Sequence, residues 1–263
     1  MTAAASTSKN LFPAVNALLG AAFIGELLAP HWSGALDGAT IVLAAGAIVL
    51  GLSRQLPPQN VLPAAFIVAL IGGLAHGCSS QAYLSIPFGP IVFNPAAGAK
   101  LFNFVPWTVP LLWVFAIFTA RGMARLILRP WRKVRNYGYW LIGLTVAQTA
   151  AFDAALEPYA WHVKHFWLWQ RTKIAFTWQG VTVLDFAGWL CVALLIMMFI
   201  TPSLIRKQPG NPSAPDYHPL LLWLGALALF AAGAGRAGLW GAAAVDAAIA
   251  AITTAFAIRG AKW

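Results

Sequence analysis

The chain has 263 residues, of which 60% are hydrophobic and only 9% are charged. Because an average soluble domain carries about 25% charged residues, this composition excludes an ordinary water-soluble protein. The formal net charge is +10, but the basic residues stand at the ends of apolar segments rather than along one polar stripe. That placement favours contact with lipid headgroups and argues against nucleic-acid binding.

Eight apolar segments approach the length that crosses the hydrocarbon core, which is about 20 residues of helix. In chain order they are residues 11–29, 39–52, 61–77, 104–120, 139–156, 181–205, 219–234 and 239–258. The sequence shows no alternating pattern of the kind found in outer-membrane barrels. We therefore expect an all-α fold: one transmembrane domain over residues 1–263, with about eight transmembrane helices and an interfacial or re-entrant segment.

Two connections differ from simple loops. Residues 78–103 contain three prolines (Pro87, Pro90 and Pro95), many apolar residues and a single charge. Such an irregular segment is expected at membrane depth or in the interface, lining a cavity where its backbone can be satisfied. Residues 159–179 interleave four tryptophans with cations, a mixture typical of an interfacial element.

The distribution of cations predicts the topology. With eight spans, both termini lie on one side, and that side carries 12 of the 17 lysines and arginines: Lys9, Arg54, Arg121, Arg125, Arg129, Arg132, Lys133, Arg135, Arg206, Lys207, Arg259 and Lys262. The other side has Lys100, Lys164, Arg171, Lys173 and Arg236. By the positive-inside rule, we expect a multi-pass protein of the cytoplasmic (inner) membrane with both termini in the cytoplasm.

Several of the seven acids lie inside predicted spans, where an ionisable group costs about 2.5 kcal/mol or more and marks a candidate functional site. In the fifth segment, Thr145, Thr149, Asp153 and Glu157 recur every four residues and share one helix face. Asp185 begins the sixth segment on the same, non-cytoplasmic side, so the three acids could meet. Carboxyls that share an apolar pocket cannot all be ionised, so such a cluster would keep a proton at neutral pH.

The other intramembrane acids have a structural alternative. Glu26, Asp37 and Asp246 could pair with Arg236, His31 or backbone donors and hold helices together.

The histidines do not predict a metal site. His162 and His165 are three residues apart, but no third ligand stands at a recognisable spacing. His76 is expected to be a packed or hydrogen-bonded histidine. Since the sequence contains no phosphate-binding loop, Ser-His-Asp order or haem pair, we expect no cofactor. A membrane cavity lined with aromatic residues and a few acids suggests a long apolar ligand instead.

Three stretches together resemble a known family: SIPFGPIVFNPAAGAKLFNFVPWTVPLLW (residues 85–113), AAFDAALEPYA (150–160) and WLWQ…FTWQGVTVLDFAGW (167–189). They are similar in order and spacing to motifs of the carotenoid-biosynthesis membrane hydratases, which include the bisanhydrobacterioruberin hydratases and the γ-carotene 1′-hydratases. The resemblance covers roughly residues 70–230.

The resemblance implies a carotenoid 1,2-hydratase, which adds water to the terminal double bond of an acyclic carotenoid by acid catalysis. Its ligands would be a carotenoid or other long isoprenoid and membrane lipids, and its partners would be other members of a membrane complex. Asp153 matches the family's aspartate, and Glu157 matches its acid before proline. Asp185 falls where an asparagine is expected, and it is the third candidate catalytic residue.

The resemblance also nominates aromatic residues for substrate binding: Phe88, Phe93, Trp107, Trp167, Trp169, Trp178 and Trp189. The motif residues Pro87 and Gly89 are retained. Ile91 and Phe93 replace two tyrosines of the family pattern, Asn94 replaces a threonine, and an expected upstream acid falls at Cys78.

These departures support a second hypothesis, a non-catalytic carotenoid-binding or structural subunit of a membrane complex. A transporter is a weaker alternative, because the chain shows no repeated halves with matching broken helices.

Overall fold

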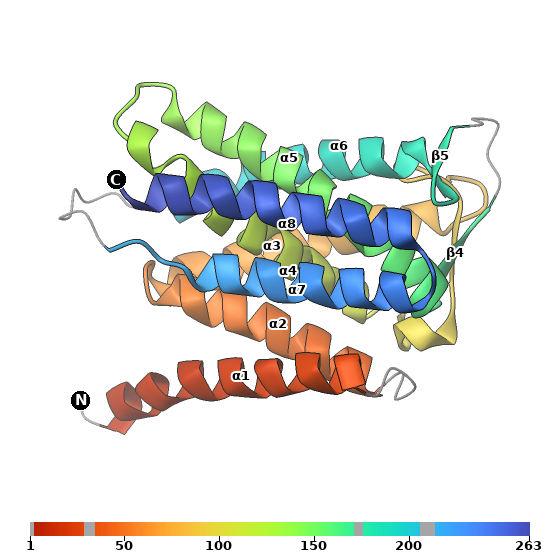
Figure 1. The fold of residues 1–263 in the computed structure, drawn as a ribbon, viewed down its shortest axis with the longest axis horizontal. Coiled ribbons are helices and arrows are strands. Elements are labelled where there is room, and N and C mark those ends of the chain that lie inside the picture. Colours follow the sequence, from red (N-terminus) through yellow and green to blue (C-terminus); the bar gives the residue numbers. More distant parts are fainter. Residues whose placement is uncertain (1–2, 29–34, 171–175, 206–213) are drawn as a thin grey trace.

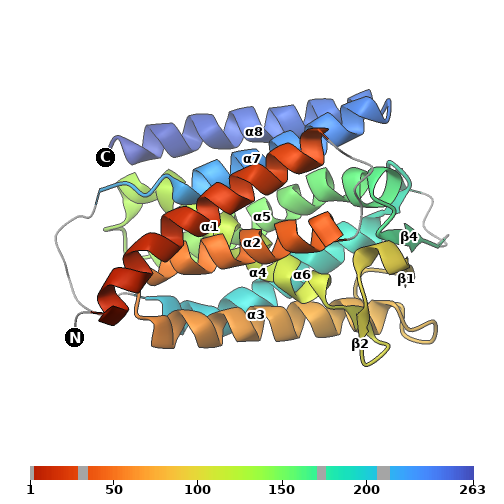
Figure 2. The same cartoon turned by 90° about the horizontal axis from the view of Figure 1, so that it is seen from below.

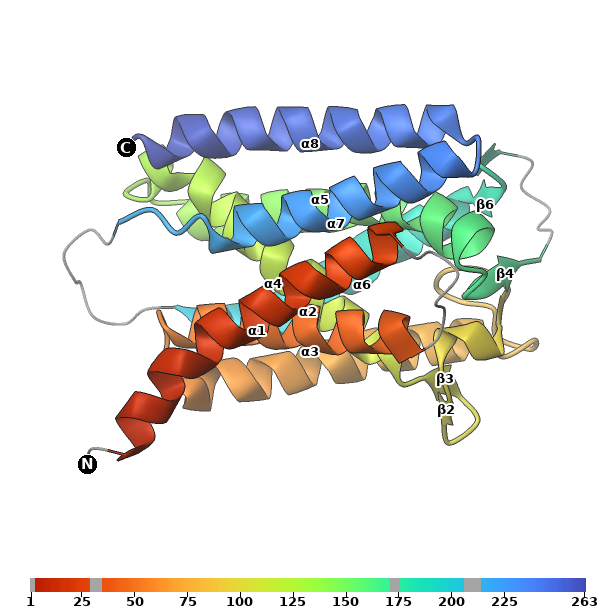
Figure 3. The same ribbon diagram turned by 60° about the horizontal axis from the view of Figure 1, so that its bottom comes forward.

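In the computed structural model, the described residues are 3–28, 35–170, 176–205 and 214–263, and they form eight α-helices (Figure 1). These are α1 (Ala3–Leu28), α2 (Ala35–Ser53), α3 (Pro58–Ser79), α4 (Thr108–Ile127), α5 (Tyr137–Pro158), α6 (Val183–Ile200), α7 (His218–Arg236) and α8 (Trp240–Ala261). The helices lie side by side along one common direction (Figures 2 and 3). The expected all-α bundle is confirmed.

Seven of these helices are long and apolar enough to cross a membrane, so the chain is a multi-pass membrane protein. The exception is α5, which has 22 residues and is as long as its neighbours. Its polar stripe of threonines and acids lowers its hydropathy. Because α5 packs against both α4 and α6, its polar face is covered by protein instead of lipid; its place as an eighth span stays a prediction.

Both chain termini lie at the same end of the bundle, as an even number of spans requires (Figures 1 and 2). The opposite end holds the two irregular connections. There, β1 (Ile91–Phe93) pairs antiparallel with β4 (Trp167–Trp169), which places Ile91 opposite Trp169. The sequence did not predict this ladder, because three residues are too few to show a strand pattern.

Two smaller hairpins complete the irregular end in the part of the chain that the structure describes. Strand β2 (Lys100–Leu101) pairs with β3 (Val105–Pro106), and β5 (Thr177–Trp178) pairs with β6 (Val181–Thr182). Short helical turns occupy Pro95–Ala97 (η1), Arg129–Trp131 (η2), Tyr159–Val163 (η3) and Thr201–Leu204 (η4).

The fourth helix is displaced from the predicted 104–120. It begins at Thr108 because Val105–Pro106 belongs to β3, and it continues to Ile127. Arg121 does not end it: this side chain is 3% exposed, and its Nη2 donates to the carbonyl of Leu204 at 2.8 Å. A buried guanidinium with one hydrogen bond to the backbone therefore lies inside the helix bundle.

Several residues with predicted roles lie outside the described part of the chain. They are the topology cations Arg171, Lys173, Arg206, Lys207 and the side chain of Lys9, and also His31, a suggested partner of the buried acids.

Candidate active site

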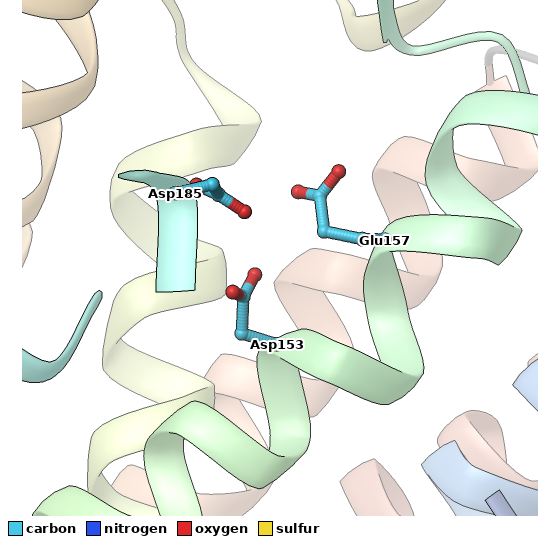
Figure 4. Close-up of side chains that lie close together, drawn as sticks. All are labelled: Asp153, Glu157 and Asp185. Atoms are coloured by element: carbon cyan, nitrogen blue, oxygen red, sulfur yellow. The ribbon is translucent and has the colours of Figure 1, made fainter. Parts of the chain in front are cut away.

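Three carboxylic acids meet inside the bundle. Asp153 and Glu157 stand one turn apart on α5, and Asp185 lies in the first turn of α6. One carboxylate oxygen from each lies within 4.8 Å of the others, and all three residues are completely buried. Their carboxyl groups face a common centre (Figure 4). The packing of α5 against α6 thus brings together acids that are 28 to 32 residues apart in the sequence.

The surroundings of this acid cluster provide little compensation for negative charge. Oε2 of Glu157 accepts hydrogen bonds from the indole N–H groups of Trp167 at 3.1 Å and Trp169 at 2.7 Å. Among the described residues, no nitrogen donor is paired with either oxygen of Asp153, and Asp185 is its close neighbour. Three adjacent buried carboxyls cannot all carry charge. The cluster therefore holds at least one proton, which Asp153 and Asp185 can share.

An aromatic cluster surrounds His76 of α3 beside the acids. The ring centroids of Phe88, Phe93, Trp113, Trp167 and Trp189 lie 4.2 to 6.5 Å from the imidazole centroid. Trp113 and Trp189 stack with their centroids 3.9 Å apart. Nδ1 of His76 accepts a hydrogen bond from Trp113 at 3.0 Å, which confirms the expectation of a packed, hydrogen-bonded histidine.

Two members of the aromatic cluster also reach the acid cluster. Trp167 donates to Glu157, and Trp189 follows Asp185 by one turn of α6 and lies next to it. The sequence did not single out His76 or Trp113 for this site, because nothing in their spacing links α3 and α4 to the tryptophan-rich segment.

A glycine sets the fit between the Pro-Phe-Gly motif and α6. A Cβ at Gly188 would lie 2.6 Å from Cδ1 of Phe88 and 3.0 Å from the carbonyl oxygen of Pro87. Gly89 has a φ of 99°, a conformation that favours glycine. The motif therefore folds closely against α6 and places the buried ring of Phe88 over the aromatic cluster.

Three of the nominated residues make other contacts than hydrogen bonds to the three acids. Trp178 is half-buried and donates to the carbonyl of Ala154 on α5 at 3.1 Å. Trp107 lines a small hollow beside η1. Asn94 is the N-cap of η1, where its side chain accepts from the backbone N–H of Ala96, and its own backbone N–H donates to Phe166 at 2.9 Å.

A mainly apolar and partly open cavity lies between α1, α2, α4, α5 and α7; its space is about 700 Å³ when the open part is included. The three acids do not line it. Phe152 and Leu156, their neighbours on α5, do line it, and so does Trp167. Since Trp167 contacts both the cavity and Glu157, its indole ring connects the two.

A second charged cluster was not predicted. Nζ of Lys164 donates to carboxylate oxygens of Glu26 and Asp37, and all three side chains are at most 5% exposed. Lys164 pairs with both acids, a partner that the sequence did not suggest beside Arg236, His31 and backbone donors; His31 lies outside the described residues. Lys164 itself is buried, and two carboxylates compensate its charge inside the protein; the interfacial position of residues 159–179 stays a prediction.

The electrostatics of Lys164 follow from these contacts. Burial by itself lowers its pKa, but the hydrogen bonds and charges of Asp37 and Glu26 outweigh burial and raise the pKa above its ordinary value. Burial and the same two acids raise the pKa of the neighbouring Tyr159. Lys164 is therefore a cation at neutral pH, while Tyr159 is a neutral phenol.

The polar groups of the irregular end offer few ligands for a metal. His162 donates through Nε2 to the carbonyl of Gln179, and His165 donates through Nδ1 to the carbonyl of Trp161. The three acids of the acid cluster are close enough to bind a hard cation through oxygen. The same spacing suits proton exchange.

Comparison with known proteins gives one match. The sequence model of a family described as "Carotenoid biosynthesis protein" matches residues 37–256. No curated protein sequence and no solved structure matches the chain significantly. The matched region contains the acid cluster, the aromatic cluster and Lys164, and it covers much more than half of the chain. The chain is therefore a member of the carotenoid biosynthesis protein family.

Proposed function

We propose that this protein is a carotenoid 1,2-hydratase that adds water to the terminal double bond of an acyclic carotenoid without a cofactor. The observation that carries the proposal is the buried cluster of Asp153, Glu157 and Asp185 beside aromatic rings. In a family of carotenoid biosynthesis, a proton donor next to π-electron faces fits the needs of alkene hydration.

The reaction uses one proton donor and one proton acceptor. The acid proton of Asp153, shared with Asp185, forms a new C–H bond with the less substituted alkene carbon, and a tertiary carbocation remains. The oxygen of a water molecule bonds to this cation and releases a proton to Glu157. Transfer of that proton back within the acid cluster restores the starting state, so the net change is the addition of one water.

The aromatic cluster supplies the second requirement, stabilisation of the carbocation. An aromatic face near a cation contributes about 0.5–2 kcal/mol, and more where water is excluded. Trp167 and Trp189 are fully or almost fully buried and adjoin the acids. Their rings are the surfaces against which the developing cation would lie.

Trp167 lies between the apolar cavity and the acid cluster, so the position of its side chain determines whether the substrate reaches the acids. The apolar cavity accepts an isoprenoid end, and the indole of Trp167 separates its lining from Glu157. A turn of this side chain would bring the terminal double bond to the acid cluster.

The replaced tyrosines favour a second candidate, a carotenoid-binding subunit without catalytic activity. Phe93, which stands where the resemblance expects a tyrosine, is buried against Trp167 with centroids 6.3 Å apart. A phenyl ring there binds hydrocarbon but donates no proton.

We also propose that the protein lies in the cytoplasmic membrane with both termini in the cytoplasm. The support is the series of cations at the end of the bundle that holds the termini, including Arg125, Arg132, Lys133 and Arg259. A phosphatase that is active only outside the cytoplasm should be inactive when fused to the C-terminus; an active fusion would reverse the orientation.

The test of function is pigment analysis in a lycopene-producing bacterial host that expresses the wild type, Asp153→Asn or Asp246→Asn. Asp246 is a matched control, since it is a buried acid of α8 outside the acid cluster. Hydroxylated carotenoids should appear with the wild type and Asp246→Asn and be absent with Asp153→Asn. If no new pigment forms but unchanged carotenoid co-purifies with the wild type, the binding-subunit candidate replaces the hydratase.

A further inference from the structure

A cluster of exposed cations lies at the end of the bundle that holds the chain termini. Two segments far apart in the sequence contribute to it, the connection from α4 to α5 and the end of α8 (Figures 1 and 3). The exposed basic residues of these segments form the basic cluster: Arg132, Lys133, Arg135, Arg259 and Lys262. Neither segment contains an acidic residue. The carboxylate at the chain end can offset one of the five charges, so four remain within these segments.

The close packing of α8 on α4 brings the two segments together. Gly260 lies so near the end of α4 that a Cβ on it would be 2.2 Å from the carbonyl oxygen of Leu126. Helix α8 also contacts η2, the turn that follows α4. Because Arg259 adjoins Gly260 and Arg132 adjoins η2, this packing places positive charges of both segments beside each other. The basic cluster is therefore a product of the tertiary structure.

Exposed apolar and aromatic side chains adjoin the basic cluster. On α8, Phe256 and Ile258 are 53% and 45% exposed just before the cations. In the other segment, Trp131, Tyr139 and Trp140 are more than half exposed on either side of the cations. Since α8 is long and apolar enough to cross a membrane, its exposed apolar side chains suit acyl chains, while exposed aromatic rings favour the level of the headgroups. The cations thus stand where an apolar surface ends.

This combination selects an amphiphile with a negative charge. Cations without neighbouring acids in their segments attract phosphate groups, and each lysine or arginine near an anionic lipid surface contributes about a fivefold factor in binding. A nucleic acid or a free phosphate would use the cations alone, whereas a phospholipid also covers the apolar side chains next to them. We propose that the basic cluster binds the headgroup of an anionic phospholipid, with the acyl chains along the exposed face of α8.

The experiment is competitive lipid binding to the purified full-length protein, read by native mass spectrometry. The probes are phosphatidylglycerol and phosphatidylcholine with identical oleoyl chains, at equal concentrations. The wild type should retain the anionic lipid about tenfold or more over the zwitterionic lipid. Glycerol 3-phosphate, which carries a phosphate without acyl chains, and a single-stranded oligonucleotide should not displace it at the same concentration. Equal retention of the two lipids, or displacement by either competitor, overturns the proposal.

Two double variants test whether both segments build the site. One combines Arg259→Gln with Lys262→Gln, and the other combines Arg132→Gln with Lys133→Gln. Because each removes two exposed charges, each should lower the ratio of anionic to zwitterionic lipid by about fivefold or more. An unchanged ratio in either variant overturns the assignment to a shared site. If one variant does not fold, the other variant and the wild-type ranking still decide.

The matched control is a double variant at the opposite end of the bundle, Lys100→Gln with Arg236→Gln. It also removes two exposed cations, so it changes the net charge of the protein by the same amount. The lipid ratio should stay at the wild-type value. A loss equal to that of the other two variants would show that net charge, and not the basic cluster, selects the anionic lipid, and the proposal would fail.

Discussion

Trp167 donates its indole N–H to Oε2 of Glu157 at 3.1 Å, and the same ring forms part of the wall of the apolar cavity. One side chain therefore contacts both the buried acids and the space that suits an isoprenoid chain. Trp169, two residues further along β4, donates to the same oxygen at 2.7 Å without lining the cavity. The β1–β4 ladder sets both indoles at the acid cluster, which gives the short strands a role in the proposed chemistry.

Trp169→Phe should lower the hydration rate without closing the cavity. The change removes one of the two N–H donors to Glu157, and a hydrogen bond to a charged group contributes about 1.5–3 kcal/mol. We expect a loss of about tenfold or more in turnover, measured as hydroxylated carotenoid formed per protein. The matched control is Trp178→Phe, which removes a bond to the backbone of α5. Equal losses in both variants would contradict a special role for Glu157.

Gly188→Ala should destabilise the protein by about 1–3 kcal/mol, because the added methyl group overlaps Phe88 and the backbone of Pro87. Gly143 on α5 provides the control, since a Cβ added there would meet no described residue beyond its own helix within 4 Å. Gly143→Ala should be neutral or stabilise by about 0.5–1 kcal/mol. Thermal unfolding in detergent would compare the two. A Gly188→Ala variant as stable as the wild type would show that the motif does not need this close approach.

Lys164→Met should destabilise the protein by about 3–5 kcal/mol, because it leaves two buried carboxylates without their cation. Adding Glu26→Gln and Asp37→Asn should restore most of the loss. Lys100→Met, on the exposed strand β2, should change stability by less than about 0.5 kcal/mol. If the triple variant were no more stable than Lys164→Met, unpaired charge would not be the cause.

The same ion pairs predict an alkaline loss of stability. Because the acids raise the pKa of Lys164, its contribution is complete below the unfolded-state value of about 10.4 and is lost as the pH rises through the higher folded-state pKa. Tm should therefore fall above about pH 10.4 more steeply in the wild type than in Lys164→Met. Parallel curves for the two proteins would rule out Lys164 as the source.

The helices and the acid stripe could be predicted from the sequence because both are local patterns. Apolar length gave eight helices, and the four-residue spacing of Asp153 and Glu157 placed them on one face. Contacts between distant segments left no such pattern. Lys164 stands 138 residues from Glu26, and its position among tryptophans is typical of an interface. The ladder of β1 and β4 is set by pairing of two irregular segments, not by the composition of either.

Hydration of a carotenoid by purified protein in water labelled with oxygen-18 tests the central claim most directly. The protein, in lipid nanodiscs with lycopene and in buffer containing EDTA, should form a product that has gained one molecule of labelled water, and Asp153→Asn should form none. A hydroxylated product without the label would show that its oxygen does not come from water, and an equally active Asp153→Asn variant would show that the acid cluster is not the catalyst. Either result would contradict the proposed hydratase mechanism.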